Sequence, residues 1–227
     1  YGVKALDIGT ALSVEVIGEN AVGSGGIAVS ADTALVQAGA SGAVWDATIN
    51  TSAPEQLSYT VGDTVVSATS SINGLRHTRG VNALTGKCYF ECVLGPQILG
   101  VGVATGNVTA LLGGSFGVDR AFWSGGFLFH TGGNTNMGGS LAEADVIQIA
   151  VDVDAQSIWI RRNDAGDWNN DASADPVGGF GGRDISGLTG AIYAYAGLQN
   201  DATASVTLAG ALGDFAFAPP SGFSAIG

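Results

Sequence analysis

Residues Glu143, Asp145 and Gln148 have the spacing that catalytic carboxylates would take along one strand. Glycoside hydrolysis generally needs two carboxylates at a set separation, one as general acid and one as nucleophile or base. The second acid of such a pair is replaced here by Gln148, whose amide can neither donate nor accept the catalytic proton. A polysaccharide-active enzyme is therefore the least favoured function that we consider.

Other residue patterns that resemble reactive sites are equally incomplete. Residues 113–117, GGSFG, match the G-x-S-x-G pattern of hydrolases, but that pattern works only where a strand turns into a helix. No helical periodicity follows it. His77 and His130 have no neighbouring ligand at metal spacing, which disfavours zinc and a Cys/His nucleophile. We predict a protein that is not an enzyme, with no catalytic residue, metal or cofactor.

The two cysteines, Cys88 and Cys92, lie four residues apart on one expected strand. Their Cα atoms would be about 13 Å apart, and a disulfide needs roughly 4.4–6.8 Å. We interpret them as two small buried hydrophobic residues.

The segment from Asn163 to Asp171, NDAGDWNND, offers oxygen ligands of the kind that calcium prefers. It lacks the D-x-[DN]-x-[DN]-G order and a closing bidentate Glu. A solvated turn is favoured because Asn, Asp and Gly are the usual turn residues, and calcium binding stays open as an alternative.

Aromatic residues beside polar loop residues are the best candidates for binding. An aromatic ring on a loop can stack on a sugar or anchor a protein partner, and nearby amides and carboxylates can orient hydrogen bonds. The predicted contact residues are Phe122, Trp123, Trp168, Asn169 and Asp171. The alternative is that these rings fold back and cap the core.

The chain carries 8 basic and 20 acidic residues, a net charge of −12. Nucleic acid is excluded as a partner, because phosphates are bound through Lys and Arg. An anionic membrane surface is disfavoured for the same reason, and no apolar run approaches the ~20 residues of a membrane helix. The charge favours a neutral or basic partner. Because the first residue is Tyr1 rather than Met, we expect a processed or trimmed chain.

The stretch from Asp145 to Arg161 predicts a β-hairpin. Ile147, Ile149, Val151 and Val153 occupy every second position, which is the period of a half-buried strand. Residues 154–156 have turn chemistry, and Ser157 begins the second strand. We expect the four apolar side chains to be buried against an opposing sheet, with the intervening Gln148 and Asp152 on the other face.

Short strands of this kind recur along most of the chain, with no convincing helical window. This spacing predicts an all-β, two-sheet antiparallel β-sandwich. The other expected strands are Leu57 to Tyr59, Thr64 to Ala68, Leu75 to Arg79, Lys87 to Val93, Ile98 to Ala104, Phe116 to Asp119, Gly126 to His130, Gly190 to Leu198 and Thr203 to Leu208.

Four motifs in order resemble the SPRY domain, a concanavalin-like β-sandwich, in the variant found in bacteriophage virion proteins. They are the central hairpin, Gly86 to Glu91 (GKCYFE), Ile98 to Ala104 (ILGVGVA) and Phe215 to Phe223 (FAFAPPSGF). The resemblance covers residues 44–227 and implies a jelly-roll fold that binds partners through loops at one edge, with no cofactor.

Residues 1–43 lie outside this resemblance. Leu12, Val14 and Val16 alternate with polar residues, and Ile27 to Val29 and Ala34 to Gln37 are β-prone. An assembly arm that docks onto another subunit and a flexible leader are equally open.

The resemblance leads us to expect a virion surface or host-recognition module of a phage or phage-like particle. Its partners would be other virion proteins, through residues 1–43, and a host surface glycan or protein, with no membrane insertion and as a homo-oligomer. A purely structural capsid-decoration, spike or tail component is the alternative. Fold does not fix function, so this expectation rests on the resemblance alone.

Overall fold

The computed structural model describes residues 43–47, 57–60, 64–69, 76–106, 119–199 and 201–226, and the backbone of two short strands, β1 (Glu15–Val16) and β2 (Ala28–Val29). The chain forms two compact units, Tyr1–Ser41 and Gly42–Gly227. In the first unit, β1 and β2 pair in antiparallel register. The expected strand at 34–37, most of that at 116–119, and Ser115 lie outside the described residues.

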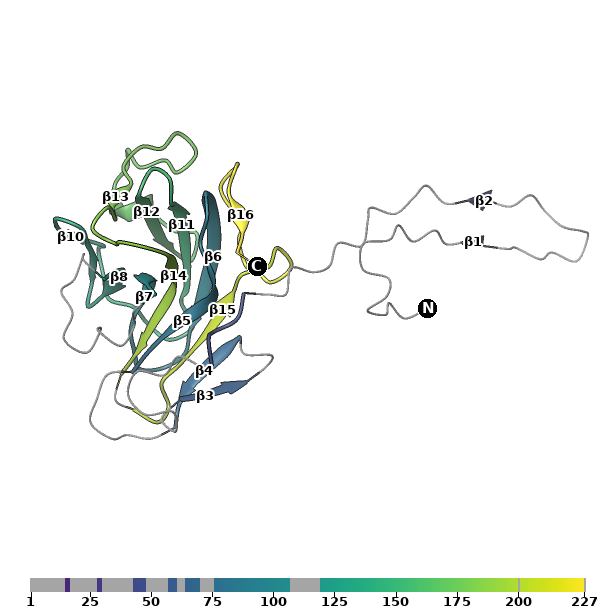
Figure 1. Ribbon diagram of the computed structural model, residues 1–227, viewed down its shortest axis with the longest axis horizontal. Coiled ribbons are helices and arrows are strands. Elements are labelled where there is room, and N and C mark those ends of the chain that lie inside the picture. The colour runs from purple at the N-terminus through teal and green to yellow at the C-terminus, as the bar shows by residue number, and fades with distance from the viewer. Residues whose placement is uncertain are drawn as a thin grey trace, which may run out of the picture. The chain divides into compact units, whose positions relative to one another are not determined.

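The second unit is a sandwich of two sheets, as predicted (Figure 1). The larger sheet has the order β13-β12-β11-β6-β15-β4-β3, with β16 pairing in parallel with β6, and the smaller has the order β10-β9-β8-β7-β14-β5. The bounds are β3 (Leu57–Thr60), β4 (Val65–Ala68), β5 (Arg76–Ala83), β6 (Lys87–Leu94), β7 (Ile98–Thr105), β8 (Arg120–Ser124), β9 (Phe127–His130), β10 (Gly133–Asn136), β11 (Val146–Asp152), β12 (Ser157–Arg162), β13 (Arg183–Asp184), β14 (Ile192–Leu198), β15 (Ser205–Ala209) and β16 (Ser224–Ala225).

The predicted hairpin is confirmed as β11 and β12, which pair from Ile147 opposite Arg162 to Asp152 opposite Ser157. The turn is closed by Asp152, whose Oδ1 accepts the backbone N–H of Ala155 at 2.9 Å. On the other side β11 pairs with β6, so the hairpin lies inside the larger sheet.

The core lies between the two sheets. Ile147, Ile149 and Val151 are fully buried there, and Val153 packs against the core from the end of the strand. Gln148 and Asp152 point to the opposite face, as expected, yet both are buried as well. The outer face of the larger sheet is therefore covered in this region.

A second apolar cluster covers that outer face. Tyr89, Ala150 and Trp159 are cross-strand neighbours on β6, β11 and β12, and they pack with Trp168 and Phe223. Trp168 comes from the loop after β12 and Phe223 from the C-terminal segment. Two segments distant in sequence thus cover one face of the sheet.

Glu91 joins two of the motifs that carry the SPRY resemblance. Its buried carboxylate accepts the backbone N–H groups of Ala216 at 2.7 Å and Phe217 at 3.0 Å, and the Tyr89 hydroxyl at 2.6 Å. The GKCYFE strand and the FAFAPPSGF segment therefore have a structural role, in which one carboxylate fixes the C-terminal segment to the sheet.

Cys88 and Cys92 are free thiols, buried on the same face of β6. Burial raises the pKa of the Cys88 thiol to about 12 and raises the pKa of Cys92 as well. Neither thiol is therefore activated as a nucleophile. Among the described residues, no helix is long and apolar enough to cross a membrane.

Candidate interaction surface

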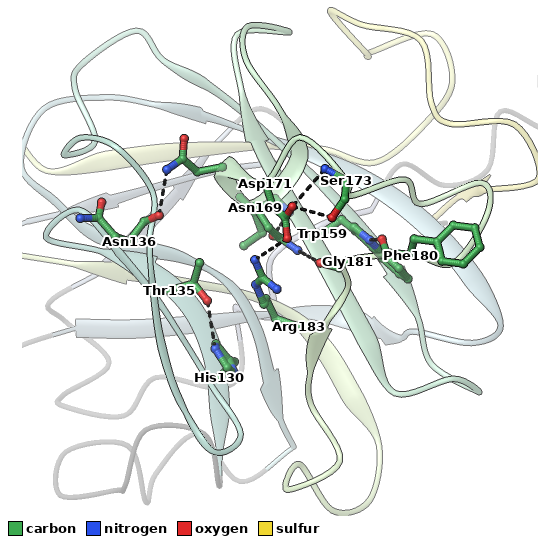
Figure 2. A network of polar contacts seen from close by, with 12 residues as sticks. His130, Thr135, Asn136, Trp159, Asn169, Asp171, Ser173, Phe180, Gly181 and Arg183 are labelled. Carbon is green, nitrogen blue, oxygen red and sulfur yellow. Dashed lines mark hydrogen bonds and ion pairs between the residues drawn. The ribbon is translucent and has the colours of Figure 1, made fainter.

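The connection between β12 and β13 carries the candidate site. We call residues 163–182 the anchored loop; it contains one 3-10 turn, Trp168–Asn170. Three of the five residues predicted to bind, namely Trp168, Asn169 and Asp171, lie within it. Figure 2 shows Asn169 and Asp171 together with the contacts that hold the loop.

Asn169 ties the anchored loop to the outer edge of β12. Its Oδ1 accepts the Ile160 N–H at 2.9 Å, and its Nδ2 donates to the Ile158 carbonyl at 3.0 Å. The same Nδ2 donates to the Gly181 carbonyl, also at 3.0 Å (Figure 2). The residue has a φ of 54°, a region that Asn adopts more readily than most residues. The fully buried side chain of Asn169 thus hydrogen-bonds the backbone of β12, and it also holds Gly181 near the end of the anchored loop.

Asp171 fixes the next part of the loop. It accepts the Ser173 backbone N–H at 3.0 Å and hydroxyl at 2.7 Å, and the Arg183 guanidinium at 3.2 Å (Figure 2). The Ser173 hydroxyl, the Ser173 N–H and Arg183 together lower the pKa of this carboxyl. Asp171 is the only one of the five predicted binding residues that is not buried.

The far end of the loop is a tight turn, residues 175–180, which we call the loop tip. Asp175 and Phe180 exchange two backbone hydrogen bonds at 2.9 Å. The carboxylate of Asp175 also accepts the N–H groups of Val177 and Gly178, and the indole of Trp159 donates to the Phe180 carbonyl at 2.7 Å. The backbone of the loop tip is therefore held by hydrogen bonds within the turn and by one hydrogen bond from the larger sheet.

The loop tip presents two large apolar side chains to solvent. Val177 is 52% exposed and Phe180 is 66% exposed. Their backbone is held by the Asp175 and Trp159 contacts, so little backbone entropy remains to be lost when a partner binds. An apolar pair on a fixed turn is a suitable anchor for a protein partner.

Sequence reasoning missed Val177 and Phe180. The available signal was the run DPVGGF, a turn sequence with apolar residues in an otherwise polar stretch. Nothing local, however, distinguishes an exposed Phe from one that folds back.

The other predicted binding residues are placed differently from the expectation. Trp168 is only 9% exposed, and the Arg161 guanidinium lies 4.4 Å from the centroid of its ring. Phe122 and Trp123 belong to β8 rather than to a loop tip, and both are buried. They point to opposite faces of the strand, so they cannot face one ligand together. The alternative that these rings contribute to packing describes what is observed.

A cavity of about 390 Å³ lies beside the anchored loop. Its walls come from β8, the turn after β10, the end of β12 and the start of the loop; they include Trp123, Met137, Ile160, Arg161 and Asn170. Asn170 holds the turn after β10 to the loop, since its Nδ2 donates to the Asn136 carbonyl at 3.2 Å. The cavity could receive a side chain of a partner bound at the loop.

The carboxylate pattern tested above is dispersed in the structure. Glu143 is exposed, whereas Asp145 is buried and accepts the Asn163 amide at 2.8 Å. Gln148 is hydrogen-bonded to the Tyr89 hydroxyl and to Arg161. Gln148 therefore belongs to the covered outer face of the sheet.

The histidines lie on different strands of the smaller sheet. His77 is buried on β5 and its Nδ1 lies 2.6 Å from the Tyr195 hydroxyl, and burial followed by the charge of Arg120 lowers its pKa to about 4. His130 Nδ1 donates to the carbonyl of Thr131. Within the part of the chain that the structure describes, no three His, Cys, Asp or Glu residues form a group that could hold a metal.

Structural comparison places this sandwich beside SPRY domains. The chain is similar to the SPRY domain of human HERC1 at 15% identity and a TM-score of 0.55, covering 77% of this chain and 99% of that one. It is also similar to the PSpry domain of TRIM65 (10% identity, TM-score 0.47, 68% and 85% covered) and to stonustoxin (13% identity, TM-score 0.42, 68% and 25% covered). No protein-family model and no curated protein matches the sequence.

At these identities the likeness shows the fold, a SPRY-like β-sandwich. The neighbours give no indication of a bacteriophage setting, which stays a prediction. SPRY domains are in general non-enzymatic interaction modules.

Proposed function

We propose that this chain is a non-enzymatic interaction module that binds a protein partner through the loop tip. The observation that carries the proposal is the pair Val177 and Phe180, exposed on a turn whose backbone is fixed by Asp175 and Trp159. The SPRY-like fold supports a binding role in general, and the choice of surface comes from these residues alone.

The chemistry of the loop tip indicates the kind of partner. Its apolar side chains would enter a hydrophobic pocket. Asp175 in the same turn is exposed, and the whole chain carries a charge of −12. A partner surface with an apolar pocket and a neutral or basic rim fits this arrangement, since like charges would slow the encounter.

The test is a comparison of captured proteins. The full chain, Phe180→Ala and Leu212→Ala would be immobilised, and proteins bound from the source cells would be quantified by mass spectrometry. Leu212 is the matched control because it is equally exposed, at 68%, in another loop. We expect a protein that binds the wild type and the control and is lost with Phe180→Ala. A bound set that is identical for all three chains would contradict the proposal.

The setting we propose is the surface of a phage or phage-like particle, where the module contacts the host. Support comes from the motif resemblance given above, and from residues 1–41 forming a unit separate from the sandwich, as an assembly arm would. Purified particles should contain the chain, and deletion of residues 1–43 should abolish its incorporation while residues 44–227 stay folded. Normal incorporation of the truncated chain would contradict the assembly role.

A purely structural decoration role predicts a different result in the same system. Particles that carry Phe180→Ala would then attach to host cells as wild-type particles do. Under the recognition role, attachment should fall while the amount of chain per particle stays constant.

A further inference from the structure

The outer face of the β9–β10 hairpin carries a second surface with a different chemistry. Phe127 lies opposite Asn136, and Phe129 lies opposite Asn134, so the four side chains form two cross-strand pairs on one face. Phe127 is 40% exposed, Phe129 is partly buried, and both asparagines are exposed. We call these four residues the aromatic–amide face.

The rings of this face are supported from behind. Phe129 stacks on the buried Phe122 with centroids 5.6 Å apart, and Phe122 in turn meets the edge of Tyr195 at 5.6 Å. Gly102 lies between Phe122 and Tyr195 in the same cross-strand row, where a Cβ would come within 2.2 Å of the Ala121 carbonyl oxygen. The row is buried at Tyr195 and reaches solvent only at β9. The buried rings behind Phe129 therefore hold it in place.

The amides are positioned as well. Asn136 accepts the Gly138 N–H through its Oδ1 at 2.8 Å, and its main-chain carbonyl accepts Asn170 Nδ2 (Figure 2). No hydrogen bond among the described residues uses its Nδ2 group, which is left as a donor. Asn134 adds a second exposed amide, with both a donor and an acceptor.

The β9–β10 hairpin that carries the face has no Asp, Glu, Lys or Arg side chain. Arg120, whose guanidinium lies 5.4 Å from the centroid of the supporting Phe122 ring, is buried and paired with Asp119. No Asp, Glu, Lys or Arg lies between Arg120 and Glu143, in a chain whose net charge is −12. Two strands by three residues span about 5 Å by 7 Å, comparable to one or two sugar rings. Size and neutrality both point to a small uncharged ligand.

We propose that the aromatic–amide face binds a neutral saccharide. Phe127 and Phe129 pack against the C–H face of a sugar ring, and the amides of Asn134 and Asn136 exchange hydrogen bonds with its hydroxyls. This site is separate from the loop tip, so either can fail without the other.

The probes are neutral hexasaccharides of glucose, mannose and galactose with β-1,4, β-1,3 and α-1,4 linkages, titrated into the full chain and followed by NMR. We expect at least one of them to shift the signals of the β9–β10 hairpin. Phe127→Ala should weaken its binding by about tenfold or more, corresponding to roughly 1.4 kcal/mol. Val81→Ala, an exposed apolar residue on β5 at the other edge of the same sheet, is the matched control and should bind as the wild type does.

Three results would overturn the proposal. The first is that no hexasaccharide shifts the hairpin signals at millimolar concentration. The second is that Phe127→Ala and Val81→Ala bind equally. The third is a dimer in sedimentation that dissociates with Phe127→Ala, which would mean that a second copy of the chain covers the face. None of them changes the expectation for Phe180 at the loop tip.

Discussion

The aromatic residues on the outer face of the larger sheet are covered, whereas the smaller sheet leaves one aromatic residue exposed at its edge hairpin. On the larger sheet the chain returns over the face, and Trp168 and Phe223 pack onto Tyr89 and Trp159. On the smaller sheet the aromatic row reaches the edge hairpin, and Phe127 is left exposed. Exposure of an aromatic residue here depends on which segments return over the sheet, and the residues next to it in sequence do not determine it.

Covered and exposed residues should also differ in the property that they affect, which is stability for the first and binding for the second. Residues on the covered face should contribute mainly to the free energy of unfolding. Residues at the loop tip and on the aromatic–amide face should contribute mainly to affinity.

Removing the carboxylate that fastens the covered face should have the largest effect. Glu91→Ala leaves the N–H groups of Ala216 and Phe217 and the Tyr89 hydroxyl without their acceptor. Each hydrogen bond to a charged group contributes about 1.5–3 kcal/mol, and less for the two N–H groups, which are only part-buried, so we expect a loss of about 3–5 kcal/mol in urea unfolding. The exposed Glu143→Ala should change stability by less than about 0.5 kcal/mol. Equal effects for the two variants would mean that Glu91 does not hold the C-terminal segment.

The covered aromatic should be more costly to remove than the exposed one. Trp168→Ala should destabilise the chain by about 2–4 kcal/mol, near the lower end of the range for a buried Trp, because 9% of the residue is exposed and its ring also contacts the polar Arg161 guanidinium. Phe127→Ala should cost about 1 kcal/mol or less. Thermal and urea unfolding of both variants would check the comparison, and a stability of Trp168→Ala close to wild type would contradict it.

Burial of His77 should make the unfolding free energy of the chain depend on pH. Its folded pKa of about 4 lies below the unfolded value of 6.5, so the unfolded chain binds the proton first as the pH falls. The contribution to stability is complete above about pH 6.5 and is lost progressively down to about pH 4, by on the order of 3 kcal/mol. His77→Gln should remove this part of the pH dependence, measured as the difference in unfolding free energy between the two chains across that range. A constant difference at every pH would contradict the assignment.

The sequence predicted well the features that depend on short-range periodicity. The alternation of Ile147, Ile149 and Val151 was sufficient to place the hairpin and its core face, because a strand has a period of two. It could not show that Gln148 and Asp152 would also be buried. Their cover comes from the anchored loop and the C-terminal segment, which are distant in sequence.

The candidate site was predicted less well for the same reason. The prediction located the loop that contains Asn169 and Asp171, since its composition is typical of a turn. It named Trp168 as a contact residue, with capping of the core as the alternative, and the ring in fact packs on a sheet that the local sequence does not reveal. Phe122 and Trp123 were assigned to a loop because a Gly-Gly turn follows, but β8 extends to Ser124 and buries both of them.

The smallest expected effect on stability belongs to the residue with the largest expected effect on binding. Phe180→Ala removes an exposed side chain and leaves the Asp175 and Trp159 contacts, which use only the backbone of residue 180. Its unfolding free energy should therefore stay within about 0.5 kcal/mol of wild type.

The affinity of this variant for the captured partner is the most direct test of the interaction role. By titration calorimetry, Phe180→Ala should bind about 5- to 150-fold more weakly than wild type, corresponding to about 1–3 kcal/mol, while Leu212→Ala binds normally. Binding of Phe180→Ala at wild-type affinity would contradict the assignment of the loop tip as the interaction surface.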